Sequence, residues 1–239
     1  KAVIAIAATV LLVGCASNGV ASRPTSCAKP GSDQELALNL ADDMANDGRL
    51  YASLANLEGL PEDLVQVRLR KARVLRLMGR NEAEPLYQSL LGTCLAADGE
   101  HGLGQLAAAR HDHACATEHL ERAVKMSPTE GKIRNDLGVV YLNQRRIPEA
   151  RFEFMTAMEL RQSDSLAAFN MVTLLIYQDN WKQAAELANM ANLSPKQVAD
   201  AQARAEKIRG SAPAGATSPA NRLSDVADAE EDPRLGEAV

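Results

Sequence analysis

The chain has 239 residues, a net charge of −5 and 46% hydrophobic residues, which is ample material for a sizeable core. Acidic and basic residues are well mixed along it, so nucleic acid is excluded as an expected partner. Aromatic residues make up only 3%, alanine and leucine abound, and few stretches alternate in the manner of strands. The composition therefore favours an all-helical protein built from small and medium side chains.

The first element is an apolar segment at residues 2–13, which follows Lys1. As a helix it would rise only about 18 Å, short of the roughly 30 Å hydrocarbon core of a bilayer. Its length is typical of a signal-peptide core. The sequence Leu-Val-Gly-Cys follows at residues 12–15 and resembles the lipobox of bacterial lipoproteins. The alternative is an ordinary signal peptide that happens to contain a cysteine.

The lipobox resemblance implies that residues 1–14 are a lipoprotein signal peptide and that Cys15 is lipidated. Acyl chains on this sulfur would contribute about 0.8 kcal/mol per buried methylene and hold the protein on a membrane. Inner-membrane lipoproteins often carry Asp after the cysteine, so Ala16 suggests the outer membrane and its periplasmic face. Residues 15–32 are small and polar and are expected to form a flexible tether.

A repeat with a period of 34 residues follows the tether. A tetratricopeptide repeat (TPR) is a pair of antiparallel helices with small and large residues at fixed positions. The clearest copy of this pattern has those residues at Leu137, Gly138, Tyr141, Ala150, Phe154 and Ala157. The same positions one period later hold Met171, Val172, Leu175, Ala184, Ala188 and Ala191. One period earlier they hold Leu103, Gly104, Ala107, Ala116, Leu120 and Ala123.

Two weaker copies with shorter turns precede these three, at residues 72–90 and 41–52. Residues 194–209 begin with Ser194 and Pro195, a favourable helix start, and suit a capping helix. We therefore expect residues 33–209 to form an all-α TPR superhelix of about five helix pairs plus a capping helix. Residues 210–239 are rich in Ala, Pro, Gly, Ser and acidic residues, so we expect a disordered acidic tail.

A cluster of three histidines and one cysteine, His111, His113, Cys115 and His119, raises the possibility of a metal site. The repeat register favours packing instead, because it places His111 and His113 in the turn between two helices. No Ser-His-Asp set, phosphate-binding glycine loop or buried carboxylate pair stands out. We therefore expect neither an enzyme nor a small-molecule substrate, and no metal or cofactor other than the acyl chains.

Cys27, Cys94 and Cys115 would meet an oxidising periplasm. The register puts Cys94 and Cys115 at opposite edges of the stack, about a helix length apart, so they should not pair. Cys27 precedes the repeats on the edge that carries Cys94. A Cys27–Cys94 disulfide is the favoured prediction, and buried free thiols are the alternative.

A stack of helix pairs leaves a groove lined by the first helix of each pair. The repeat register predicts that this lining comprises Leu69, Arg73, Arg76, His101, Gln105, Ala108, Asn135, Val139, Leu142, Phe169, Thr173 and Ile176. Basic members gather in the front repeats and apolar members in the back, which suits a peptide with an acidic part and an apolar part. The alternative for Phe169 and Ile176 is packing against the capping helix.

The lipobox, short tether, about five repeats and acidic tail together resemble the TadD-type lipoproteins of the tight-adherence (Flp) pilus system. Two residues depart from the strict repeat pattern, Ala107 where Tyr is usual and Gln162 where Pro is usual. The resemblance implies a pilotin that binds the secretin subunit and aids its targeting to, or assembly in, the outer membrane. A TPR scaffold for another envelope complex, such as a type IV pilus pilotin or an adaptor of cell-wall enzymes, remains the alternative.

Overall fold

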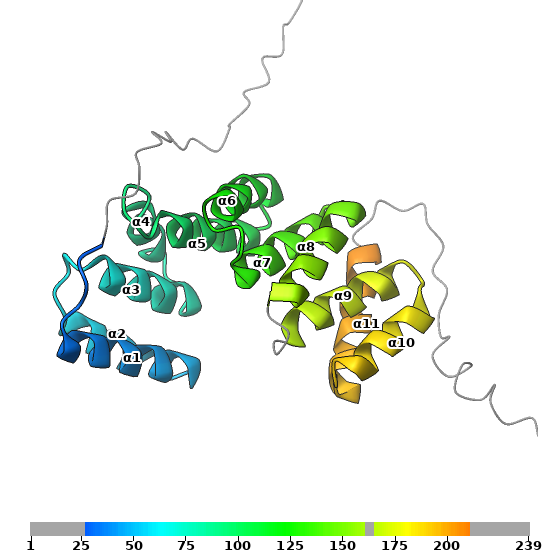
Figure 1. Cartoon of the computed structure of the whole chain (residues 1–239), viewed down its shortest axis with the longest axis horizontal. Coiled ribbons are helices and arrows are strands. Elements are labelled where there is room, and N and C mark those ends of the chain that lie inside the picture. Colours follow the sequence, from blue (N-terminus) through cyan, green and yellow to red (C-terminus); the bar gives the residue numbers. More distant parts are fainter. Residues whose placement is uncertain (1–26, 161–164, 211–239) are drawn as a thin grey trace, which may run out of the picture. The chain divides into compact units, whose positions relative to one another are not determined.

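A computed structural model describes residues 27–160 and 165–210 of the chain (Figure 1). The expected signal peptide, Cys15, most of the tether and residues 211–239 of the expected tail lie outside the described residues. The helices of the described ranges are α1 (Ser32–Asn46), α2 (Leu50–Glu58), α3 (Val65–Leu77), α4 (Ala83–Gln88), α5 (Ala96–Ala109), α6 (His113–Met126), α7 (Gly131–Asn143), α8 (Ile147–Leu160), α9 (Ser165–Tyr177), α10 (Trp181–Met190) and α11 (Pro195–Gly210). All regular structure in these ranges is helical, as predicted.

The chain divides into two compact units between Arg145 and Arg146. Unit 1 contains α1–α7 and unit 2 contains α8–α11. None of the described helices is both long enough and apolar enough to cross a bilayer.

The turns that follow the first helix of each pair share one backbone conformation. Gly48, Gly79, His111, Arg145 and Asp179 all have positive φ, between 58° and 76°. The last three lie 34 residues apart, which is the period predicted from the sequence. A single left-handed residue of this kind commonly ends a helix, and glycine adopts it without steric cost.

The hydrogen bonds at these turns are those of a Schellman motif, in which two backbone N–H groups satisfy the last helical carbonyls. At the end of α5, the N–H of Asp112 donates to the carbonyl of Ala107 and that of His111 to Ala108, each at 3.0 Å. His111 is therefore an exposed helix-ending residue, in agreement with its predicted position in the turn.

The crossing of α5 and α6 depends on a glycine. A Cβ added to Gly104 would lie 2.6 Å from Cγ of Leu120 and 3.4 Å from the carbonyl oxygen of Ala116. Both of these α6 residues are buried. The small side chain at this position lets the two helices approach closely, as the repeat pattern predicts for this pair.

Replacing Gly104 by alanine should therefore destabilise unit 1. Overpacking a buried site costs about 1–3 kcal/mol, which outweighs the roughly 1 kcal/mol that alanine gains over glycine in a helix. Urea unfolding followed by circular dichroism would measure the loss. The control is Gly92→Ala, because a Cβ added there meets nothing within 4 Å. Equal stability of the two variants would contradict the close crossing.

Unit 2 is organised around α9, which packs against α8, α10 and α11. Nine of its residues are buried, on all sides of the helix, as expected for a helix covered from several directions. The last helix, α11, turns Ala201, Ala205 and Ile208 inward. Its start is a capping box, in which Ser194 Oγ accepts from the N–H of Gln197 and Gln197 Oε1 accepts from the N–H of Ser194.

A disulfide joins Cys27 to Cys94, with the two Cα atoms 5.6 Å apart. It links the chain before α1 to the segment between α4 and α5, across a sequence separation of 67 residues. The predicted pairing is confirmed, and free thiols at these two positions are excluded.

Candidate functional site

A cavity of about 340 Å³ opens in unit 1 between helices that are distant in sequence. Its walls come from α1, α3, α4, α5 and the first turn of α7. The lining residues are Asp42, Leu69, Arg70, Arg73, Arg76, Tyr87, Asp98, His101, Gly102, Gln105 and Lys132.

Helical periodicity explains why these residues meet. On α3, Leu69, Arg73 and Arg76 recur at intervals of four and three, so they share one face of the helix. On α5, His101 and Gln105 are four residues apart and share a face in the same way. The structure thus gathers the four predicted polar groove residues of the front repeats around a single cavity.

Two arginines of the wall share one carboxylate. Asp42 Oδ2 accepts from Nε of Arg70 at 2.8 Å, and Asp42 Oδ1 lies 3.6 Å from Nη1 of Arg73. Arg73 also donates from Nη2 to Oδ1 of Asn46 at 2.8 Å. Arg70 and Asp42 are partly buried, so their arrangement fixes the wall that α1 and α3 share.

Arg76 differs from its two neighbours. Its Nε donates to the hydroxyl of Tyr87 at 3.4 Å, and no carboxylate of the described residues pairs with its guanidinium. Burial raises the pKa of the Tyr87 phenol, despite the opposing charges of Arg76 and Arg73, so the ring stays neutral. Gly102 of α5 has no room for a Cβ against this ring, which holds Tyr87 in place beside the cavity.

His101 and Gln105 are held by a residue that was not singled out in the sequence. Nε2 of each lies 2.7 Å from Oδ2 of Asp136 on α7. Burial alone would raise the pKa of Asp136, but hydrogen bonds from His101 and Gln105 outweigh it and hold the pKa below its ordinary value. In the sequence, the only indication of Asp136 is its place one residue before Leu137, a position of the repeat pattern.

The other predicted groove residues of unit 1 are mostly internal. Asn135 is 5% exposed and donates from Nδ2 to Oδ1 of Asp136 at 3.3 Å. Leu142 is 1% exposed, and Val139 is half-buried. Leu142 therefore belongs to the core rather than to an open surface.

In unit 2 the predicted groove face of α9 packs internally. Thr173 and Ile176 are at most 1% exposed, and Phe169 is half-buried. Helix α11 packs against α9, and Arg209 donates from Nη2 to the carbonyl of Ile176. Thr173 and Ile176 are thus core residues here, because the capping helix occupies this side of α9. For Ile176, packing against the capping helix is the alternative prediction given above.

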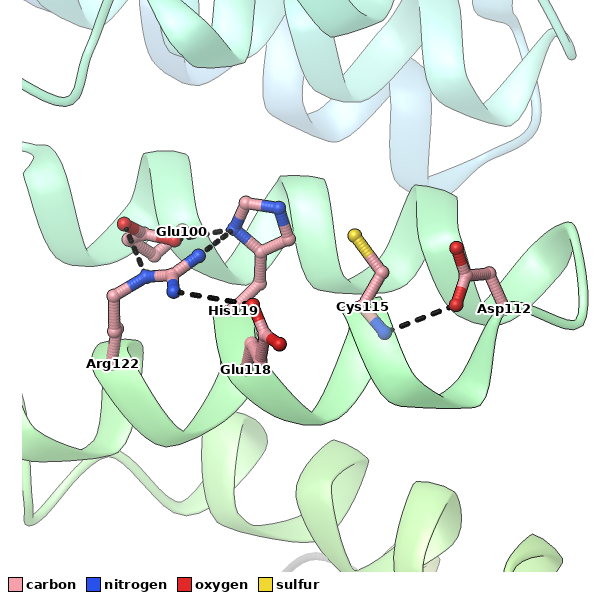
Figure 2. Close-up of polar contacts among 6 residues, drawn as sticks. All are labelled: Glu100, Asp112, Cys115, Glu118, His119 and Arg122. Atoms are coloured by element: carbon pink, nitrogen blue, oxygen red, sulfur yellow. Dashed lines mark hydrogen bonds and ion pairs between the residues drawn. The ribbon is translucent and has the colours of Figure 1, made fainter. Parts of the chain in front are cut away.

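The fold does not bring the histidines and Cys115 together at one point. The rings of His111 and His113 are in edge-on contact, with their centroids 6.1 Å apart, whereas His119 points toward Glu100 of α5 and Arg122 of α6 (Figure 2). His111 lies in the exposed turn, and the backbone N–H of Cys115 donates to Oδ1 of Asp112, the N-cap of α6, at 3.0 Å. His119 is buried. Among the described residues, no three His, Cys, Asp or Glu side chains are placed to hold a metal ion.

The cavity is consequently a cationic recess in a stack of helix pairs. Four basic side chains, Arg70, Arg73, Arg76 and Lys132, face two carboxylates, Asp42 and Asp98. Burial raises the pKa of Asp98, with the charge of His101 opposing the shift. Such a surface is suited to capture of an acidic group. Fold and site together define a helical-repeat protein of the kind that binds other proteins.

Comparison with known proteins identifies the family. The chain is 41% identical over 223 residues to "TPR repeat-containing protein PA4299" of Pseudomonas aeruginosa, covering 92% of this chain and 91% of that protein. It belongs to this family of TPR repeat-containing proteins, although no protein-family model matches it.

Solved structures share the fold. The TPR protein TTC0263 of Thermus thermophilus aligns with a TM-score of 0.56 and 17% identity, over 74% of this chain and 98% of that chain. PilF of Pseudomonas aeruginosa aligns with a TM-score of 0.57 and 14% identity, over 73% of this chain and 88% of that chain. The tetratricopeptide-repeat fold predicted from the 34-residue period is confirmed.

Proposed function

We propose that this protein is an outer-membrane lipoprotein that acts as a pilotin for the secretin of a Flp/Tad (type IVb) pilus system. It is anchored by acyl chains on Cys15, binds the secretin subunit in the periplasm and aids its targeting to, or assembly in, the outer membrane. The repeat units supply the binding surface and the tether supplies reach from the membrane.

The observation that carries the proposal is the cationic cavity of unit 1. It is built around four residues that the repeat register predicts to face a peptide groove, Arg73, Arg76, His101 and Gln105. Membership of a TPR family supports a protein partner rather than a substrate. The sequence motif Leu-Val-Gly-Cys at residues 12–15 supports the membrane anchor.

The anchor is tested by Cys15→Ala in the native host. Without acyl chains, the protein is expected to be soluble in the periplasm or retained at the inner membrane, and secretin multimers in the outer membrane should fall. Membrane fractionation with immunoblotting of both proteins measures this. An Ala16→Ser variant serves as the control, because it retains the lipidated cysteine. Unchanged outer-membrane location of Cys15→Ala would refute the anchor.

The partner is tested by affinity capture from envelope extracts with the wild-type protein, followed by mass spectrometry. The secretin should be enriched over a mock capture. If another envelope complex is enriched in its place and the secretin is absent, the pilotin role is rejected in favour of a scaffold for that complex.

A further inference from the structure

The cavity of unit 1 also defines the chemistry of the partner segment. We propose that it is a subsite for an acidic stretch of the bound protein, whose carboxylate docks on the guanidinium of Arg76 with Arg73 and Lys132 as flanking positive charges. The proposal rests on the proposed function only in taking the ligand to be a protein segment.

Arg76 is prepared to receive a carboxylate. Its Nε bond to the Tyr87 hydroxyl fixes the plane of the guanidinium, and its Nη donors have no partner among the described side chains. An arginine fork matches the two oxygens of a carboxylate, so a second group could bind there without breaking an existing ion pair. Arg70 and Arg73, by contrast, already share Asp42.

The ion pairs of the wall leave one guanidinium for the ligand. Arg70 and Arg73 share Asp42, and Asp98 lines the same cavity as a second negative charge. A phosphate monoester carries a charge of about −1.5 to −2 at neutral pH, which is more than the single fork of Arg76 can pair with, whereas a carboxylate matches that fork. We therefore take a carboxylate as the ligand, and competition with phosphate tests this choice.

The remaining lining suits a polypeptide. Leu69, Gly102 and the ring of Tyr87 supply apolar surface beside the charges, and Gln105 supplies an amide. The volume of about 340 Å³ lies at the lower end of the range of roughly 300–1,000 Å³ for ligand sites, which suits a short stretch of side chains. Apolar contact next to an anchored carboxylate is what an acidic peptide with interspersed leucines would offer.

The test uses fluorescence anisotropy with the oxidised protein and two labelled synthetic peptides. One probe alternates glutamate and leucine, and the other has glutamine in place of each glutamate. The acidic probe should bind more tightly, by about tenfold or more, since a hydrogen-bonded charge pair is lost with the glutamine probe. Equal binding of the two probes would overturn the proposal.

Matched variants locate the binding. Arg76→Gln and Lys132→Gln should each weaken binding of the acidic probe, Arg76→Gln by about tenfold, whereas Asp98→Asn should tighten it by a factor of about two to five. Lys125→Gln makes the same charge change on an exposed part of α6, outside the cavity, and should leave the affinity unchanged. Circular dichroism confirms that each variant is folded. Unchanged affinity of folded Arg76→Gln would refute the subsite.

Competition distinguishes other anions. Inorganic phosphate or phosphatidylglycerol vesicles that displace the acidic probe at lower concentration than free glutamate peptide would assign the cavity to those ligands and overturn the proposal. The outcome of the peptide-binding experiments can be told apart from the outcome of the secretin capture. Acidic-probe binding that Arg76→Gln weakens by about tenfold, with no secretin captured by the wild type, would support the subsite while rejecting the pilotin role.

Discussion

Replacing both Cys27 and Cys94 by serine is expected to lower the free energy of unfolding by about 4 kcal/mol. The disulfide closes a loop with a sequence separation of 67 residues, and the chain-entropy relation gives about 4 kcal/mol for a loop of that size at 25 °C. The loop encloses α1, α2, α3 and α4, so these helices gain most from the constraint on the unfolded chain.

Urea unfolding followed by circular dichroism measures this prediction for the wild type with and without a thiol reductant. The double serine variant should have a midpoint well below that of the oxidised wild type. Reductant should lower the midpoint of the wild type by more than it changes that of the variant, because only the wild type carries the Cys27–Cys94 disulfide. A loss smaller than about 1 kcal/mol would indicate that the unfolded chain is already compact around this loop.

The repeat period was a strong signal because it is set by close helix contacts. Gly104 has no space for a Cβ, so packing alone disfavours a larger residue there. The turn residues His111, Arg145 and Asp179 keep the same spacing even without glycine, because the helix-ending hydrogen bonds fix their conformation. A regular spacing of small residues and of helix-ending turns can therefore be recognised in a sequence.

The polar contacts of the site could be predicted only in part. The register gives the face on which Arg76 and His101 lie, but it does not give their partners, since Asp136 lies on a different helix. It also treats every first helix as open to solvent. The capping helix α11 packs against α9. Thr173 is buried where the pattern predicted a groove lining, and Ile176 is buried in agreement with the alternative of packing against the capping helix.

The partners of Glu100 could not be predicted from the sequence either. This residue lies between Gly99 and His101 in a stretch of α5 with no motif of its own, yet it is only 5% exposed and accepts bonds from two side chains of α6. Nδ1 of His119 lies 2.6 Å from Glu100 Oε2, and Nε of Arg122 lies 2.9 Å from Glu100 Oε1 (Figure 2). The carboxylate thus ties the two helices together.

The variant Glu100→Ala is expected to lower the free energy of unfolding by about 3–5 kcal/mol. Removing one member of a buried charged pair leaves its buried partner, here His119, without compensation, whereas Arg122 is partly exposed. Here the alanine removes the acceptor that His119 and Arg122 share. The control is Glu118→Gln, which also faces Arg122 but at 3.9 Å and on the exposed surface of α6. It should cost less than about 1 kcal/mol.

The same cluster predicts a pH dependence. Burial would raise the pKa of Glu100, but hydrogen bonds from His119 and Arg122 and the charge of Arg122 outweigh it and hold the pKa below the ordinary 4.5. A carboxyl whose pKa is lowered by folding stabilises the protein above its unfolded pKa and loses that stabilisation as the pH falls through the folded value. Wild-type stability should therefore decrease below about pH 4.5 more steeply than that of Glu100→Gln, which cannot ionise. Parallel pH profiles of the two proteins in urea unfolding would mean that the Glu100 carboxylate does not join α5 to α6, since only an ionised group held by His119 and Arg122 makes the wild type more sensitive to acid.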